Sequence, residues 1–168
     1  MQALELLLND ATDDAVRREW SVLHRAGLPS QADHTGASNA PHVTMLATDR
    51  LPATDEELGA VVAGAVPLTL HLGPVVAFPG RRLVLARLVV ADAALLELHS
   101  ALVDAGRATP SPHTAPGRWV PHVTLARGIP MDELGAALSL LRAPGFDGAA
   151  TRLRRWDSVA KHTHPVPA

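Results

Sequence analysis

The four-residue segment Pro-His-Val-Thr occurs twice in this chain, at residues 41–44 and again 80 residues later at 121–124. Each copy follows a long polar loop and begins an apolar run. Around both copies the expected elements follow the same order, namely strand, helix, strand, helix and strand, so the repeat extends to whole halves of the chain. We therefore expect an α+β fold with two similar lobes. No linker separates the halves, and we expect one domain over residues 1–168, with a loosely ordered C-terminal tail over about 161–168.

Hydrophobic periodicity and capping signals predict the limits of these elements. Strands are expected at residues 2–8, 41–46, 68–78, 83–90, 121–126 and 147–160. Helices are expected at about 13–26, 54–65, 92–105 and 132–142. Thr54 and Glu57 have the spacing of a capping box, in which each side chain bonds the backbone N–H of the other residue. This box marks the start of the second helix.

The charge balance argues against a protein that binds long nucleic acids. The chain has 15 Lys and Arg residues against 17 Asp and Glu residues, which gives a formal net charge of −2. Proteins that contact many phosphates usually carry an excess of basic residues. A small phosphorylated substrate needs only a few local Arg side chains, so it remains compatible with this composition.

Several chemistries are excluded by residues that the chain lacks. Without Cys there is no disulfide framework, no thiolate zinc site and no cysteine nucleophile. The chain also lacks Tyr and the G-x-x-x-x-G-K-[ST] loop of P-loop nucleotide hydrolases. The apolar N-terminal run has no basic residues before it and is interrupted at Asn9-Asp10, unlike a signal peptide or a membrane span. We therefore expect a cytoplasmic protein.

The repeated motif carries residues suited to phosphoester chemistry. Side chains alternate along a strand, so His42 and Thr44 share one face, and His122 and Thr124 share one face of the second copy. Attack on phosphorus needs one group that takes a proton and another that gives one. An imidazole with a pKa near 6.5 can serve in either form, and threonine hydroxyls can donate hydrogen bonds to phosphate oxygens. This scheme requires no metal and no cofactor.

At these two motifs the sequence resembles the 2H phosphoesterase superfamily, which is named for paired His-x-Thr/Ser motifs. It is most similar to the bacterial branch of 2′-5′ RNA ligases and RNA 2′,3′-cyclic phosphodiesterases. The similarity covers nearly the whole chain, including residues 68–80 and 120–127. It implies a bilobal α+β fold in which two pseudo-symmetric lobes, with antiparallel sheets flanked by helices, enclose a central cleft.

The resemblance also implies an activity and a role for each motif residue. The implied reaction is metal-independent hydrolysis of a 2′,3′-cyclic phosphate to a 2′-phosphomonoester, in some relatives with reversible 2′-5′ RNA ligation. By analogy His42 is the general acid that protonates the departing 3′ oxygen, and His122 is the general base that activates water. Thr44 and Thr124 hold the phosphate oxygens. Because the two copies are nearly identical, the sequence itself does not assign the acid and the base.

Two further residues are candidates for substrate contacts. Trp119 lies three residues before His122 and is the best placed aromatic side chain for stacking on a base, although a Trp at that position is commonly part of a core. Strict alternation puts Arg127 on the face opposite His122, so it reaches the cleft only if the strand bulges or ends there. The pair His162 and His164 has a chelating spacing, but no nearby carboxylate completes a metal site.

These residues lead to one favoured function and to two alternatives. We expect a monomer without an obligate protein or membrane partner, acting on RNA 2′,3′-cyclic phosphate ends or small cyclic-phosphate nucleotides. The first alternative is a catalytically silent RNA-end or nucleotide-binding protein on the same scaffold, and product formation distinguishes it. The second is a metal-dependent hydrolase that uses the surplus His residues, and activity in excess EDTA distinguishes that. Without a second copy, a single His-Val-Thr would favour a purely structural histidine.

Overall fold

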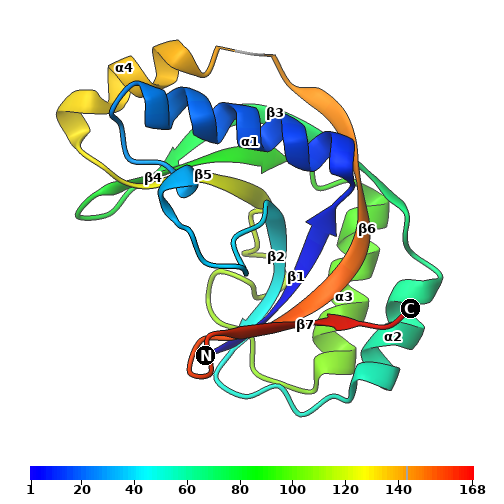
Figure 1. Ribbon diagram of the computed structural model, residues 1–168. Coiled ribbons are helices and arrows are strands. Elements are labelled where there is room, and N and C mark those ends of the chain that lie inside the picture. Colours follow the sequence, from blue (N-terminus) through cyan, green and yellow to red (C-terminus); the bar gives the residue numbers. More distant parts are fainter. Residues whose placement is uncertain (143) are drawn as a thin grey trace.

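The computed structural model describes residues 1–142 and 144–168 and contains the repeated order of elements (Figure 1). The first half contains β1 (Gln2–Leu8), α1 (Asp10–Arg25), β2 (His42–Thr48), α2 (Asp55–Ala63) and β3 (Leu68–Phe78). The second half contains β4 (Leu83–Val89), α3 (Ala93–Gly106), β5 (His122–Ile129), α4 (Leu134–Leu140) and β6 (Phe146–Asp157), and β7 (His162–Val166) follows. Two short 3-10 helices, η1 (Gln31–Asp33) and η2 (Met131–Glu133), precede β2 and α4.

All strand pairs are antiparallel, and the strand order is β1-β2-β5-β4-β3-β6-β7. Strand β1 also pairs with β6, so six strands form a closed circuit with β7 at its outside. One lobe contains β1, β2 and the C-terminal part of β6, and the other contains β3, β4 and β5. The third strand of each half therefore pairs in the lobe of the other half. This exchange ties the two repeats into one sheet.

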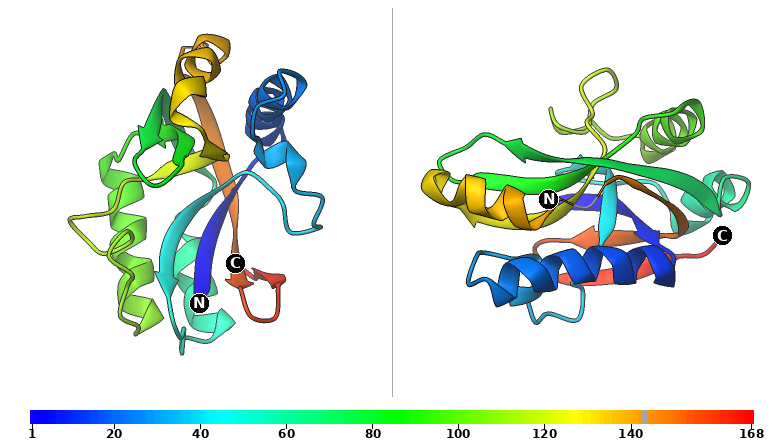
Figure 2. Two further views of the ribbon diagram at one scale, coloured as in Figure 1. Left: turned by 90° about the vertical axis from the view of Figure 1, so that its left-hand side faces the viewer. Right: turned by 90° about the horizontal axis from the view of Figure 1, so that it is seen from above.

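Local signals account for the helices that surround this sheet. Asn9 caps α1 by accepting a hydrogen bond from the Thr12 backbone N–H, and Thr54 and Glu57 form the expected capping box of α2. Helices α1 and α4 lie side by side at one end of the molecule, and α2 and α3 lie side by side at the other (Figures 1 and 2). None of the helices among the described residues is both long and apolar enough to span a membrane.

A helix of each half also packs against the motif strand of the other half. Helix α1 packs against β5, and α3 packs against β2. A buried ion pair joins Arg87 of β4, which is 0% exposed, to Glu19 of α1, and Arg87 also donates to the Gly73 carbonyl oxygen at 2.8 Å. Each motif strand is therefore supported from behind by a helix of the opposite half, and the two lobes share one core.

Expectations for the C-terminal part of the chain differ from the structure. The tail expected to be loosely ordered instead forms β7, which pairs with β6 and buries Val166. Pro165 is compatible with this strand because β7 lies at the edge of the sheet, where one N–H faces solvent. Strand β6 ends at Asp157 rather than 160, since residues 158–161 form the turn into β7. The fourth helix is shorter than 132–142 because its first turn is the 3-10 helix η2.

Candidate functional site

The two His-x-Thr motifs meet where β2 and β5 pair. Val43 lies opposite Val123, and both are completely buried. Because side chains alternate, the residues on either side of each valine point to the other face. The antiparallel direction then puts His42 next to Thr124 and Thr44 next to His122. All four side chains are partly exposed, so the pairing brings together the residues that the sequence singles out.

His42 is fixed by a backbone hydrogen bond and faces a carboxylate. Its Nδ1 lies 2.7 Å from the Ala40 carbonyl oxygen, which can only accept, so Nδ1 carries the proton and Nε2 is free for proton transfer. Nε2 lies 3.4 Å from Oε1 of Glu5, an ion-pair geometry when the ring is protonated. Glu5 is in turn bonded by Nε of Arg154 at 2.7 Å, and both side chains are buried.

His122 has the same backbone contact but a different electrostatic environment. Its Nδ1 donates to the Val120 carbonyl oxygen at 2.7 Å, and its ring packs against Phe78 with centroids 4.7 Å apart. Burial lowers the pKa of His122, the hydrogen bond to Val120 opposes this shift, and the positive charges of Arg127 and His42 lower the pKa further. His122 is therefore suited to be the neutral imidazole of the pair.

Two tryptophans fix the backbone of the motif strands. Trp20 of α1 donates its indole N–H to the Thr124 carbonyl oxygen at 3.0 Å, and Trp119 donates to the Thr44 carbonyl oxygen at 2.9 Å. Trp119 also stacks on His99, with ring centroids 3.9 Å apart and nearly parallel planes. Trp119, predicted as a base-stacking residue, lies behind the motif strand and lines neither of the two cavities described below.

A β-bulge brings Arg127 to the face of the motif. In the pairing with β4, Ala86 lies opposite Thr124 and Leu85 opposite Ala126, so Leu125 is an extra residue of β5. Leu125 and Ala126 are both buried, and Arg127 returns to the exposed side. This is the condition under which the sequence analysis allowed Arg127 to reach the cleft.

The first half has a corresponding bulge directly after its histidine motif. In the pairing of β1 with β2, Leu4 lies opposite Leu46 and Glu5 opposite Thr44, so Met45 is the extra residue. Ala47 then occupies the position that corresponds to Arg127. The two halves therefore share the same strand shape, but only the second carries a cation at this position.

Two cavities flank the motif residues. One, of about 720 Å³, contains His42 and Thr44, and the other, of about 460 Å³, contains His122. Arg127 lines both, so they adjoin at this side chain. The second cavity has a largely apolar wall formed by Phe78, Pro79, Val84 and Val120, together with His113 and Arg118. A cavity of about 750 Å³ between residues 48–52 and 107–112 contains neither motif histidine.

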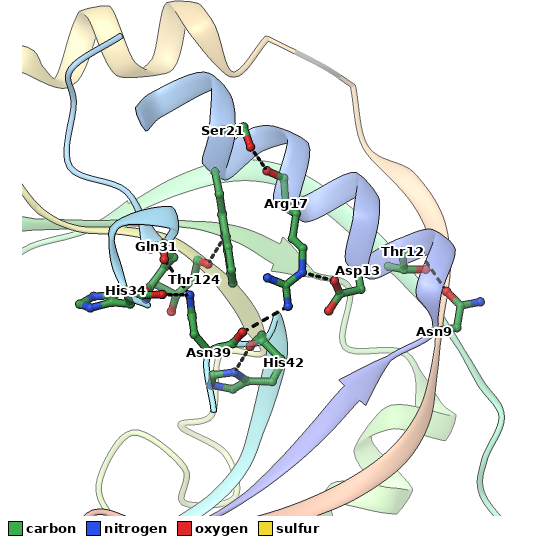
Figure 3. A network of polar contacts seen from close by, with 12 residues as sticks. Asn9, Thr12, Asp13, Arg17, Ser21, Gln31, His34, Asn39, His42 and Thr124 are labelled. Carbon is green, nitrogen blue, oxygen red and sulfur yellow. Dashed lines mark hydrogen bonds and ion pairs between the residues drawn. The ribbon is translucent and has the colours of Figure 1, made fainter. Parts of the chain in front are cut away.

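The loop before His42 forms one wall of the larger of the two cavities that flank the motif residues, and it is held in place by polar contacts (Figure 3). Arg17 of α1, itself paired with Asp13, donates to the Asn39 carbonyl oxygen at 3.2 Å. The Asn39 side-chain amide donates to the carbonyl oxygens of Gln31 and His34, both at 2.8 Å. These contacts connect α1 to the segment that enters the motif.

Sequence reasoning missed Glu5 and Arg154 as parts of this site. A signal was present, because Glu5 is the only charged residue in the otherwise apolar segment 3–8. The chelating pair considered at the C-terminus does not assemble a metal site: His164 contacts Asp55 at 3.2 Å, and the His162 ring centroid lies 6.2 Å from that of His164. Within residues 1–142 and 144–168, no three His, Cys, Asp or Glu side chains form a group that could hold a metal ion.

Comparison with known proteins identifies one family and one fold. The model of the 2′-5′ RNA ligase superfamily matches residues 12–160. Among solved structures, E. coli LigT complexed with 3′-AMP is 19% identical, with a TM-score of 0.57 over 99% of this chain and 94% of that chain. Usb1 from Kluyveromyces marxianus is 16% identical, with a TM-score of 0.54 over 99% of this chain and 97% of that chain.

A second structure of the Kluyveromyces protein contains uridine monophosphate, and it is 14% identical with a TM-score of 0.50 over 99% of this chain and 98% of that chain. No curated protein matches the sequence. At these identities the solved structures establish the shared fold, which confirms the α+β class expected from the sequence.

Proposed function

The chain belongs to the 2′-5′ RNA ligase superfamily of 2H phosphoesterases, and we propose that it opens a 2′,3′-cyclic phosphate on a ribonucleotide or RNA end to give a 2′-phosphomonoester. The family supports a phosphoesterase or RNA-end-processing enzyme. The observation that carries the more specific proposal is the pairing of Val43 with Val123, which turns two histidines and two threonines toward one place.

The reaction needs one proton acceptor and one proton donor. Nε2 of His122 takes a proton from water as its oxygen attacks phosphorus. The bond from phosphorus to the ribose 3′ oxygen breaks, and Nε2 of His42 gives its proton to that oxygen. The product carries a 2′ phosphate and a free 3′ hydroxyl, and a proton exchange with solvent restores both rings. If the 5′ hydroxyl of a second RNA replaced water, the same steps would form a 2′-5′ linkage.

The surroundings of the two rings support this division of roles. A general base must be neutral, and the pKa of His122 is lowered by burial and by the nearby cations. A general acid must be protonated, and the carboxylate of Glu5 faces Nε2 of His42 at 3.4 Å. The opposite assignment would put the proton on the ring that has cations and no carboxylate beside it.

Three further side chains would stabilise the phosphate. The hydroxyls of Thr44 and Thr124 can donate to its non-bridging oxygens, and their main chains are held by the indole N–H groups of Trp119 and Trp20. Arg127 lines both cavities and adds a cation where negative charge develops. The nucleotides bound to LigT and Usb1, 3′-AMP and uridine monophosphate, are consistent with a nucleotide substrate.

Phosphorus NMR of a 2′,3′-cyclic nucleotide in excess EDTA tests the proposal. We expect the wild-type protein to form the 2′-phosphomonoester, and His42→Ala and His122→Ala each to slow the reaction by about 10²- to 10⁴-fold, the usual contribution of a general acid or base. The exposed His162 lines neither cavity, so His162→Ala is a matched control with the wild-type rate.

The other outcomes identify the alternatives. Binding of the cyclic nucleotide without turnover would indicate a catalytically silent nucleotide-binding protein. Turnover that EDTA abolishes would indicate a metal-dependent hydrolase. Near-normal rates in either motif variant would show that the two histidines are not the acid and base.

A further inference from the structure

Trp156 differs from the other two tryptophans in the contacts that its indole makes with the described residues. The indole N–H groups of Trp20 and Trp119 are bonded to backbone carbonyls. Trp156 of β6 is half-buried and lines the larger cavity, and among the described residues its indole makes no hydrogen bond and no ring contact. A Trp that packs in a core usually finds a partner for its N–H. A free indole on a cavity wall is instead suited to a ligand.

The strand register places Trp156 in line with His42. Along β1, Leu7 lies opposite His42, Glu5 opposite Arg154, and Ala3 opposite Trp156. Residues two apart point to the same face, and both Glu5 and Ala3 line the cavity that contains His42. Four residues of strand separate the His42 level from the Trp156 level, about 13 Å at 3.3 Å per residue. The cavity floor is therefore long and runs from the reacting group to an aromatic side chain.

Cations lie at the two ends of this floor. Arg127 lines the cavity near the motif, and Lys161, five residues after Trp156 in the turn between β6 and β7, also lines it. Between them the charge of Arg154 is matched by that of Glu5. An aromatic face beside a cation is the combination that single-stranded RNA binding uses, since bases stack on the ring and the backbone phosphate contacts the charge.

The proposed reaction sets the direction of an RNA strand in the site. If His42 protonates the departing 3′ oxygen, the ribose that carries this oxygen lies on the His42 side of the phosphorus, in the larger cavity. The 5′ oxygen of that ribose leads to the next phosphate and nucleotide. A strand that continues from His42 along the cavity floor reaches Lys161 and Trp156 with its second nucleotide.

We propose that Trp156 and Lys161 form a binding site for the second nucleotide of an RNA strand, on the 5′ side of the nucleotide with the cyclic phosphate. The Trp156 indole stacks on the base, and the Lys161 ammonium contacts the phosphate between the two nucleotides. This inference rests on the proposed function and narrows its substrate to RNA ends of at least two nucleotides. A mononucleotide leaves this part of the cavity empty.

The test compares kcat/KM for a cyclic mononucleotide, a dinucleotide with the same cyclic end, and a dinucleotide whose 5′ residue lacks its base. We expect wild type to prefer the complete dinucleotide over the abasic one by about 5- to 150-fold, the range measured for stacking of one base on an aromatic side chain. Trp156→Ala should bring this preference close to one, and Trp156→Phe should retain most of it.

Lys161 is tested by the phosphate that both dinucleotides share. Lys161→Ala should lower the preference for the abasic dinucleotide over the mononucleotide and should weaken its dependence on salt. Arg18 is an exposed cation of α1 that does not line the cavity, so Arg18→Ala is the matched control and should keep both preferences. Thermal unfolding of Lys161→Ala, a surface change in a turn, excludes loss of fold as the cause.

Failure of this inference differs from failure of the proposed function. Equal kcat/KM values for all three substrates in wild type, or preferences that persist in Trp156→Ala and Lys161→Ala, would overturn the inference and leave the function standing. If wild type opens none of the substrates, the function fails, and binding of a fluorescent dinucleotide 3′-phosphate then decides the inference. Weaker binding by Trp156→Ala supports the site, and equal binding overturns it.

Discussion

The buried pair of Glu5 and Arg154 offers a quantitative test of how the floor of the site is built. Nε of Arg154 lies 2.7 Å from Oε2 of Glu5, and the two side chains are 9% and 8% exposed. Glu5→Leu would leave a buried guanidinium without its counter-charge, which typically costs about 3–5 kcal/mol. For a chain of 168 residues, about 1 kcal/mol corresponds to a change in Tm of about 2–4 °C. The expected decrease in Tm is therefore about 6–20 °C.

The matched experiment is a double-mutant cycle measured by thermal unfolding. Arg154→Met should also lower Tm, because it leaves the Glu5 carboxylate buried. The double variant Glu5→Leu/Arg154→Met replaces both charges by apolar side chains of similar size, and we expect it to regain most of the lost stability. Its rate of hydrolysis should nevertheless stay low, since His42 has lost the carboxylate beside Nε2. Losses of Tm that simply add in the double variant would refute the pairing.

Three further predictions concern the rest of the site and its support. His122 must be neutral to act as base, and its pKa is lowered by burial and by Arg127. The value of kcat/KM should therefore rise with pH around a pKa below 6.5, and Arg127→Ala should move this rise to higher pH. A pH profile that Arg127→Ala leaves unchanged would contradict the assignment of His122 as base. Trp119→Phe keeps the stack on His99 but loses the N–H to Thr44, a loss of about 0.5–1.5 kcal/mol that should lower Tm by about 1–6 °C. In Gly59→Ala the new Cβ would lie 2.0 Å from the Pro167 carbonyl oxygen, so Tm should fall, and deletion of residues 167–168 should remove this effect.

The elements with strong local signals were predictable from the sequence. Strand β1 has the predicted limits, β3 matches the expected run 68–78, and the capping box of Thr54 and Glu57 starts α2 as expected. The two motifs also identified the family, because paired His-x-Thr segments at this spacing are specific. These features depend on residues close together in the chain, where periodicity and capping chemistry act.

Features that depend on contacts between residues far apart in the sequence could not be predicted from local patterns. The bulges at Met45 and Leu125 depend on the pairing with β1 and β4, so alternation alone put Arg127 on the wrong face. Composition suggested a loose tail, but the free edge of β6 pairs with residues 162–166. Only the distance of Trp119 from His122 along the chain is evident from the sequence, and this distance favours base stacking. In the fold, the indole N–H of Trp119 donates to the Thr44 carbonyl oxygen.

Sulfur substitution tests the separate roles of the two histidines most directly. The substrate is a 2′,3′-cyclic nucleotide in which sulfur replaces the bridging 3′ oxygen, because a thiolate departs without needing a proton from a general acid. We expect this substrate to restore hydrolysis by His42→Ala toward the wild-type rate and to leave His122→Ala slow. Equal rescue of both variants, or rescue of His122→Ala alone, would contradict the assignment of His42 as acid and His122 as base.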